Sequence, residues 1–118
     1  MLADGSIKTD VETLGDVTVL SAAGEIDLLT CPAFKQAIFD VLAGNPAALV
    51  IDLTEVSFFS SAGVSSLVAA REAMGDDSPF AVVPATSIVG RILEIAGLTD
   101  FLSVQETREA ALMAVQAR

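Results

Sequence analysis

Histidine is absent from this chain of 118 residues, and Cys31 is its only cysteine. These two absences exclude disulfides within the chain, thiolate zinc clusters and every catalytic triad that depends on an imidazole. The sequence also lacks a Gly-x-Ser-x-Gly elbow, a Gly-x-Gly-x-x-Gly turn and a phosphate-binding loop. We therefore expect no enzymatic activity, no cofactor and no metal, and we rank an enzyme or nucleotide-binding protein last among the hypotheses.

Basic residues are scarce, because 6 lysines and arginines face 16 aspartates and glutamates, for a formal net charge of −10. Such a charge repels a phosphate backbone, so we expect no nucleic-acid partner. The acidity either favours a partner with a basic face or only keeps an apolar protein in solution. Charge alone does not choose between these two interpretations.

Long hydrophobic runs are missing too, since Gly, Asp, Ser or Pro interrupts each apolar stretch well before the ~20 residues of a membrane span. No basic segment precedes an apolar run at the start of the sequence, as it would in a secretory signal. We expect a cytoplasmic protein with no membrane partner. The length and the 53% share of apolar residues suit a single domain over residues 1–118, with an ordered core from about 5 to 115.

Residue periodicity divides the chain into alternating elements. Strands are predicted at 7–11, 17–22, 47–53, 80–83 and 102–104, and helices from Thr30 to Gly44, from Ser60 or Ser61 to Gly75, from Ser87 to Gly97 and from Glu106 onward. The 47–53 stretch is almost wholly apolar, which predicts a central strand covered on both faces, and residues 54–59 then form a connection. Side chains expected in the core are Cys31, Phe58, Phe59, Ile88, Ile92, Leu93 and Ile95.

This order of elements predicts an α/β fold. The turn signal Gly15-Asp16 makes the first two strands an antiparallel hairpin, whereas the later strand-helix-strand crossovers are parallel. We expect a mixed sheet of about four to five strands packed by about four helices. Binding sites gather at the carboxyl ends of parallel strands, which directs attention to the residues after the 47–53 strand.

The junction 58–63 places two hydroxyls, Ser60 and Ser61, at the start of a helix. A phosphate there, with a charge of about −1.5 to −2, would meet free N–H donors and the positive end of the helix dipole. Phosphorylation could therefore change how a partner binds this surface without unfolding the domain. The alternative is that a serine only caps the helix, and no histidine or lysine nearby could activate it as a nucleophile.

A second polar segment, Gly24-Glu25-Ile26-Asp27, ends the second predicted strand. Glycine permits an unusual turn here, and the two carboxylates lie close to the opening of the first helix. Acid-base chemistry or a metal site would need further ligands at a suitable spacing, so a solvated turn is the simpler interpretation. Asp52 and Glu55 are interpreted in the same way, as loop acids.

Three stretches together resemble the STAS domain of bacterial anti-sigma factor antagonists: 24–27, the segment Asp52-Leu53-Thr54-Glu55-Val56-Ser57-Phe58-Phe59-Ser60-Ser61-Ala62-Gly63, and Ile92-Leu93-Glu94-Ile95-Ala96-Gly97-Leu98-Thr99-Asp100. The resemblance covers nearly the whole chain and extends to the order of strands and helices. It implies a single STAS domain that acts as a binding protein and a kinase substrate.

The resemblance also implies a mechanism of partner switching. The unphosphorylated protein binds an anti-sigma factor, often a serine kinase, and so frees a sigma factor for transcription; phosphorylation abolishes this binding, and a phosphatase reverses it. The family's phosphorylated serine falls on Ser61, with Ser60 as the fallback acceptor. The implied partner-binding residues are Gly24, Glu25, Ile26, Asp27, Ser60, Ser61, Ala62 and Gly63.

The sequence departs from the family motif at two positions. The family's aspartate is replaced by Ser60, and its second hydroxyl residue by Ala62. Loss of the aspartate removes an acid that orients the hydroxyl or contacts the kinase, so a weaker response or a different kinase is expected. The alternative function is a STAS scaffold in a stress-signalling or transport complex, whose binding would not respond to Ser61→Glu.

Overall fold

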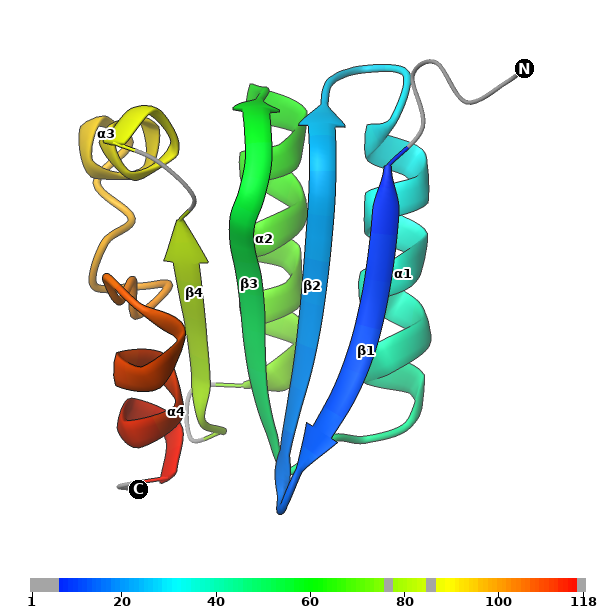
Figure 1. The fold of residues 1–118 in the computed structure, drawn as a ribbon, viewed down its shortest axis with the longest axis vertical. Coiled ribbons are helices and arrows are strands. Elements are labelled where there is room, and N and C mark those ends of the chain that lie inside the picture. The colour runs from blue at the N-terminus through cyan, green and yellow to red at the C-terminus, as the bar shows by residue number, and fades with distance from the viewer. Residues whose placement is uncertain (1–6, 76–77, 85–86, 117–118) are drawn as a thin grey trace.

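A computed structural model describes residues 7–75, 78–84 and 87–116 of the chain (Figure 1). Its elements, in order, are β1 (Lys8–Leu14), β2 (Val17–Ile26), α1 (Cys31–Ala43), β3 (Ala48–Phe59), α2 (Ser61–Met74), β4 (Phe80–Pro84), α3 (Ser87–Ile95) and α4 (Arg108–Gln116). The predicted α/β fold is confirmed, with four strands in one mixed sheet and four helices.

The strands lie in the order β1-β2-β3-β4. The two-residue turn after Leu14 pairs β1 antiparallel with β2, while β2, β3 and β4 run parallel to one another. The prediction that the 47–53 strand lies inside the sheet is confirmed, since β3 pairs with a neighbour on each side. All three parallel strands point toward the same edge of the sheet, where α3 follows β4 (Figure 1).

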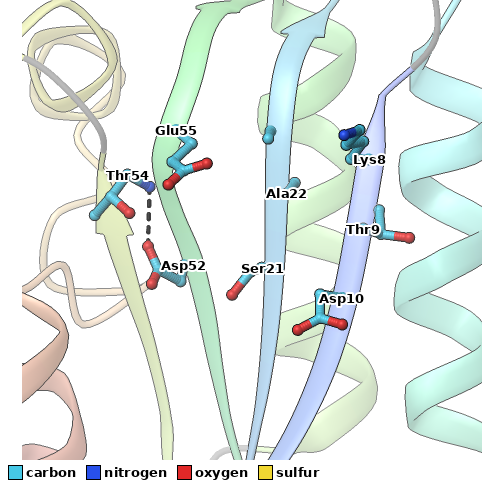
Figure 2. Close-up of a pocket in the computed structure, with 9 residues that line it drawn as sticks. Lys8, Thr9, Asp10, Ser21, Ala22, Asp52, Thr54 and Glu55 are labelled. Atoms are coloured by element: carbon cyan, nitrogen blue, oxygen red, sulfur yellow. Dashed lines mark hydrogen bonds between the residues drawn. The ribbon is translucent and has the colours of Figure 1, made fainter.

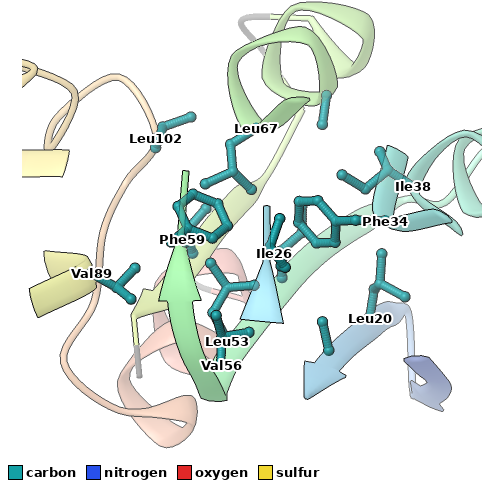
Figure 3. Close-up of a cluster of buried hydrophobic side chains, with 14 of the residues drawn as sticks. Leu20, Ile26, Phe34, Ile38, Leu53, Val56, Phe59, Leu67, Val89 and Leu102 are labelled. Carbon is teal, nitrogen blue, oxygen red and sulfur yellow. The ribbon is translucent and has the colours of Figure 1, made fainter. Parts of the chain in front are cut away.

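Helices cover the sheet unequally. On one face α1 and α2 lie side by side and bury a large core that includes the edge-to-face pair Phe34 and Phe59, with ring centroids 6.0 Å apart (Figure 3). On the other face α4 packs on a smaller cluster of valines and alanines. Cys31 lies in the larger core with 7% of its surface exposed, as predicted for a small buried hydrophobe.

The main departure from the predicted fold is the stretch 54–59, which continues β3 instead of forming a connection. This stretch contains polar residues because one face of the sheet is exposed to solvent here. Strand alternation then separates the two phenylalanines: Phe59 is buried, as predicted, whereas Phe58 is 50% exposed and its assignment to the core is wrong. β2 is also longer than predicted and includes Gly24 to Ile26.

Two further predictions are corrected. Residues 102–104 form no strand, since only Val104 pairs, through an isolated bridge to Val82. Ile95 is 76% exposed, while Leu93 is fully buried, because two residues separated by two positions point to opposite sides of a helix. Ile92 is half-buried. The side chains of Ser87 and Ile88, and the chain ends at 1–6 and 117–118, lie outside the described residues.

Candidate functional site

The carboxyl ends of β2 and β3 bring the two predicted site segments together. Glu25 pairs with Phe58 and Ile26 with Phe59 in the parallel register, and the Ser60 N–H donates to the Ile26 carbonyl at 2.9 Å. Residues 24–27 and 60–63, more than thirty positions apart in sequence, therefore form one end of the domain. Two register shifts in the β2–β3 pairing, between Ser21 and Ala23 and between Gly24 and Glu25, each place an extra residue on β3 and shape this end.

The two serines have different roles. Ser60 is the N-cap of α2, with extended backbone angles, and its hydroxyl accepts from the Gly63 N–H at 3.4 Å. Ser61 is the first residue of the helix and is exposed. Of the two, Ser61 is therefore the hydroxyl free to meet another protein, beside the unpaired N–H groups and positive dipole of a helix start.

Gly63 is buried and can only be glycine without rearrangement. A Cβ atom at this position would lie 2.8 Å from Cζ of Phe59 and 3.1 Å from a methyl group of Ile26. Ile26 itself is fully buried. Ile26 and Gly63, both in the predicted contact set, pack α2 closely onto the strand ends, and their part in partner binding stays a prediction.

Asp27 organises the loop between β2 and α1. Its Oδ1 accepts hydrogen bonds from the N–H groups of Leu29 at 2.9 Å and Thr30 at 3.0 Å. These bonds, that from Thr30 above all, lower the pKa of the Asp27 carboxyl below its ordinary value of 3.8. Asp27 thus keeps its charge at neutral pH but uses part of its hydrogen-bonding capacity within the chain.

Thr30 and Glu25 complete this loop. The Thr30 hydroxyl donates to the Glu25 carbonyl at 2.6 Å and accepts from the Asp27 N–H at 2.9 Å. Thr30 directly precedes α1, as predicted. Its side chain does not cap the helix and holds the end of β2 in place. Glu25 contributes its backbone to this network, while the residue as a whole is exposed. Its carboxylate is the acid available to a partner.

Three exposed apolar residues of this end were missed in the sequence: Leu28 is 79% exposed, Leu29 84% and Phe58 50%. A groove of about 550 Å³ continues from Leu28 between α1 and α2, where it is lined by Cys31, Lys35, Ala62, Ser65 and Ala69 among others. The pair Leu28-Leu29, placed between a strand and the proline of a helix start and outside any helical stripe, was the available signal. The site is therefore both acidic and apolar.

The open half of the second sheet face carries a separate polar hollow of about 480 Å³ (Figure 2). Lys8 and Asp10 line it from β1, Ser21 from β2, and Asp52 and Glu55 from β3. The interpretation of Asp52 and Glu55 as loop acids is wrong, since both lie on β3. Asp52 is also buried, and its carboxylate accepts from the Thr54 N–H at 2.9 Å and from the Arg108 guanidinium at 3.0 Å.

Within the described ranges, no three carboxylate or thiol groups come together in a way that could hold a metal ion. Across the same residues, the helices are too short or too polar to span a bilayer. The end of the domain with Glu25 and Ser61 instead exposes a carboxylate and a hydroxyl beside several apolar side chains.

The STAS domain model matches residues 8–111 of the chain. This chain belongs to the STAS family. Among curated relatives, the anti-sigma-F factor antagonist RsfB of Mycobacterium tuberculosis is 40% identical over 116 residues, which cover 98% of this chain and 95% of RsfB. The family resemblance predicted from the motifs at 24–27 and 52–63 is thereby confirmed.

Solved structures agree with this STAS assignment. The crystal structure of an anti-sigma factor antagonist from Mycobacterium paratuberculosis superposes with a TM-score of 0.92 at 40% identity, over 98% of this chain and 99% of that one. The Bacillus protein SpoIIAA, solved in a phosphorylated form, has a TM-score of 0.68 at 16% identity, over 94% of this chain and all of its own. The latter likeness is one of fold alone.

Proposed function

We propose that this STAS domain is an anti-sigma factor antagonist, which binds an anti-sigma factor in the cytoplasm and thereby releases a sigma factor for transcription. The observation that carries the proposal is the single surface formed by residues 24–27 and 60–63, with Ser61 exposed at the start of α2. RsfB, which shares 40% identity over nearly the whole chain, is named as such an antagonist.

The chemistry of this end defines the partner surface. Glu25 offers a carboxylate, and Leu28, Leu29 and Phe58 offer apolar side chains to solvent. An anti-sigma factor that fits would present a basic group to Glu25 and an apolar patch to the leucines and the phenylalanine. Gly24, with φ of 113°, allows the strand end to adopt the required backbone shape, and Asp27 holds the loop.

Phosphorylation of Ser61 is the proposed switch, and an anti-sigma factor of the serine-kinase type is the proposed kinase. A phosphate on Ser61 would add about −1.5 to −2 charges at a helix start, which tolerates anions, beside a surface that already carries Glu25. The fold would therefore persist while the partner is repelled, and a phosphatase would restore binding. Ser60 serves as the fallback acceptor, although its hydroxyl already caps α2.

One feature of the chain favours a second candidate function. Ser60 occupies the position of the family's aspartate, so the acid that precedes the acceptor serine is missing. A STAS scaffold without a phosphorylation switch, in a stress-signalling or transport complex, would not need that acid. The two candidates differ in their response to a negative charge at position 61.

The test is a capture experiment from lysate of the source cells, with wild type, Ser61→Glu and Ser61→Ala compared side by side by mass spectrometry. We expect wild type and Ser61→Ala to retain an anti-sigma factor, and Ser61→Glu to bind it about tenfold or more weakly. Circular dichroism should show the same fold for all three chains, because position 61 is exposed.

Other outcomes separate the candidates. Equal capture by wild type and Ser61→Glu would keep the antagonist and remove the switch. Phosphate that persists on Ser61→Ala after incubation with the captured kinase would move the acceptor to Ser60. Absence of any anti-sigma factor among the captured proteins would favour the scaffold.

A further inference from the structure

The C-terminal helix α4 packs on the sheet through small apolar side chains, Ala111 and Val115, with Leu112 partly buried beside them. It has nine residues, of which only Ala111 and Val115 are buried, whereas α1 buries Cys31, Phe34 and Ile38. A hollow of about 330 Å³ adjoins its C-terminal end, beside Val115 and the β1–β2 turn. A short terminal helix that buries few side chains opens more readily than the core of a domain.

A single arginine at the start of α4 supplies the strongest polar attachment. The Arg108 guanidinium contacts three strands, with Nη1 3.2 Å from Oε1 of Glu12 on β1, Nη2 3.2 Å from the Ser21 hydroxyl on β2, and Nε 3.0 Å from Oδ2 of Asp52 on β3. It thereby ties the last helix to positions 56, 87 and 96 residues away in the sequence.

Asp52 is the buried partner of Arg108 in this attachment. Only 8% of its side chain is exposed, and its two oxygens are occupied by the Thr54 N–H and by Arg108. If α4 moved away, the carboxylate would lose its only ion pair among the described residues while remaining on the sheet. Opening of the helix would break this ion pair together with the contacts of Arg108 to Glu12 and Ser21, so Arg108 opposes opening through all three partners.

We propose that α4 is a detachable strap, which leaves the sheet as a unit while the side covered by α1 and α2 stays folded, and that the Arg108 ion pairs set how often it opens. Opening uncovers a second apolar surface of the sheet, formed by Val17, Val19, Ala48, Val50, Ala81 and Val83. This surface is hidden in the closed structure and lies on the opposite side of the sheet from α1 and α2. The strap does not depend on the identity of the partner at Ser61.

Amide hydrogen exchange of the full chain tests the strap. Arg108→Met keeps the aliphatic stem and removes the charge, and Arg91→Met, at an exposed arginine of α3, is the matched control. We expect Arg108→Met to accelerate exchange of the α4 amides about tenfold, with less than about twofold change in the β3 amides. Arg91→Met should leave both sets unchanged.

A milder variant covers the case in which Arg108→Met destabilises the whole domain. Glu12→Gln removes the more exposed partner, 45% exposed, and leaves the Asp52 pair in place, so a smaller acceleration confined to α4 is expected. Equal acceleration of α4 and β3 in both variants would show that α4 unfolds only with the rest of the domain. Unchanged α4 exchange in Arg108→Met would show that the ion pairs do not hold it. Either result overturns the proposal.

Discussion

The two faces of the sheet are stabilised in different ways. The face under α1 and α2 buries large side chains, including the phenylalanines at 34 and 59 and the leucines at 20, 49, 53 and 67. The face under α4 buries valines and alanines and adds an ion pair between Arg108 and Asp52. Since hydrophobic stabilisation grows with the apolar area buried, most of the folding free energy must come from the first face.

This division has a consequence for the partner-binding end. The strand ends that carry Glu25 and Ser61 are supported from the first face, where Gly63 lets α2 approach Phe59 and Ile26. Under the proposed function, a rigid support suits a surface that presents Ser61 in a fixed place. The second face is more polar and less completely covered, which suits movement. Three predictions test this comparison, beginning with the largest effect.

Truncation of one large side chain on each face should separate the two most clearly. Phe34→Ala, on the first face, is expected to lower the free energy of unfolding by about 3–5 kcal/mol. Val115→Ala, on the second face, should lower it by only about 1–2 kcal/mol, because fewer carbon atoms are removed, and beside an existing hollow. Urea denaturation measures both values, and similar losses would contradict the division.

The close approach at Gly63 should have an intermediate effect. Gly63→Ala places a methyl group against the Phe59 ring, and overpacking of this kind costs about 1–3 kcal/mol, less about 1 kcal/mol gained in helix propensity. Gly90→Ala on α3 is the control, since its Cβ would lie 3.6 Å from Pro84, an ordinary contact. Thermal melts should show a lower Tm only for Gly63→Ala; a matching gain in both variants would mean that the Phe59 ring moves aside freely.

The smallest effect concerns charge at the rim of the first face. The pKa of Asp27 is lower in the folded protein than the ordinary 3.8, so its carboxylate stabilises the fold above that pH, and this stabilisation is lost as the pH falls through the lowered pKa. Wild type should therefore exceed Asp27→Asn in urea midpoint at pH 7, and the gap should close below pH 3.8. If the difference in urea midpoint stays constant down to the lowest pH at which the protein is folded, it comes from the shape of the side chain and not from its charge.

Much of the fold could be predicted from sequence because its signals are local. The turn at Gly15-Asp16, the apolar run at 47–53 and the serine before α2 follow from neighbouring residues alone. The same holds for the family, since its motifs are continuous in the chain and the match to residues 8–111 confirms them. Periodicity and turn chemistry act over a few residues, so a short stretch of sequence contains all the information that they need.

Only the tertiary structure decided which of these residues meet solvent and which meet each other. Phe58 and Phe59 have the same chemistry, and the open sheet face exposes the first of them. Ile26 belongs to the family motif but is buried, and Leu28 beside it is exposed. Asp52 is held by Arg108 from 56 positions away. Burial and pairing depend on segments brought together by the fold, and no local pattern in the sequence records those distances.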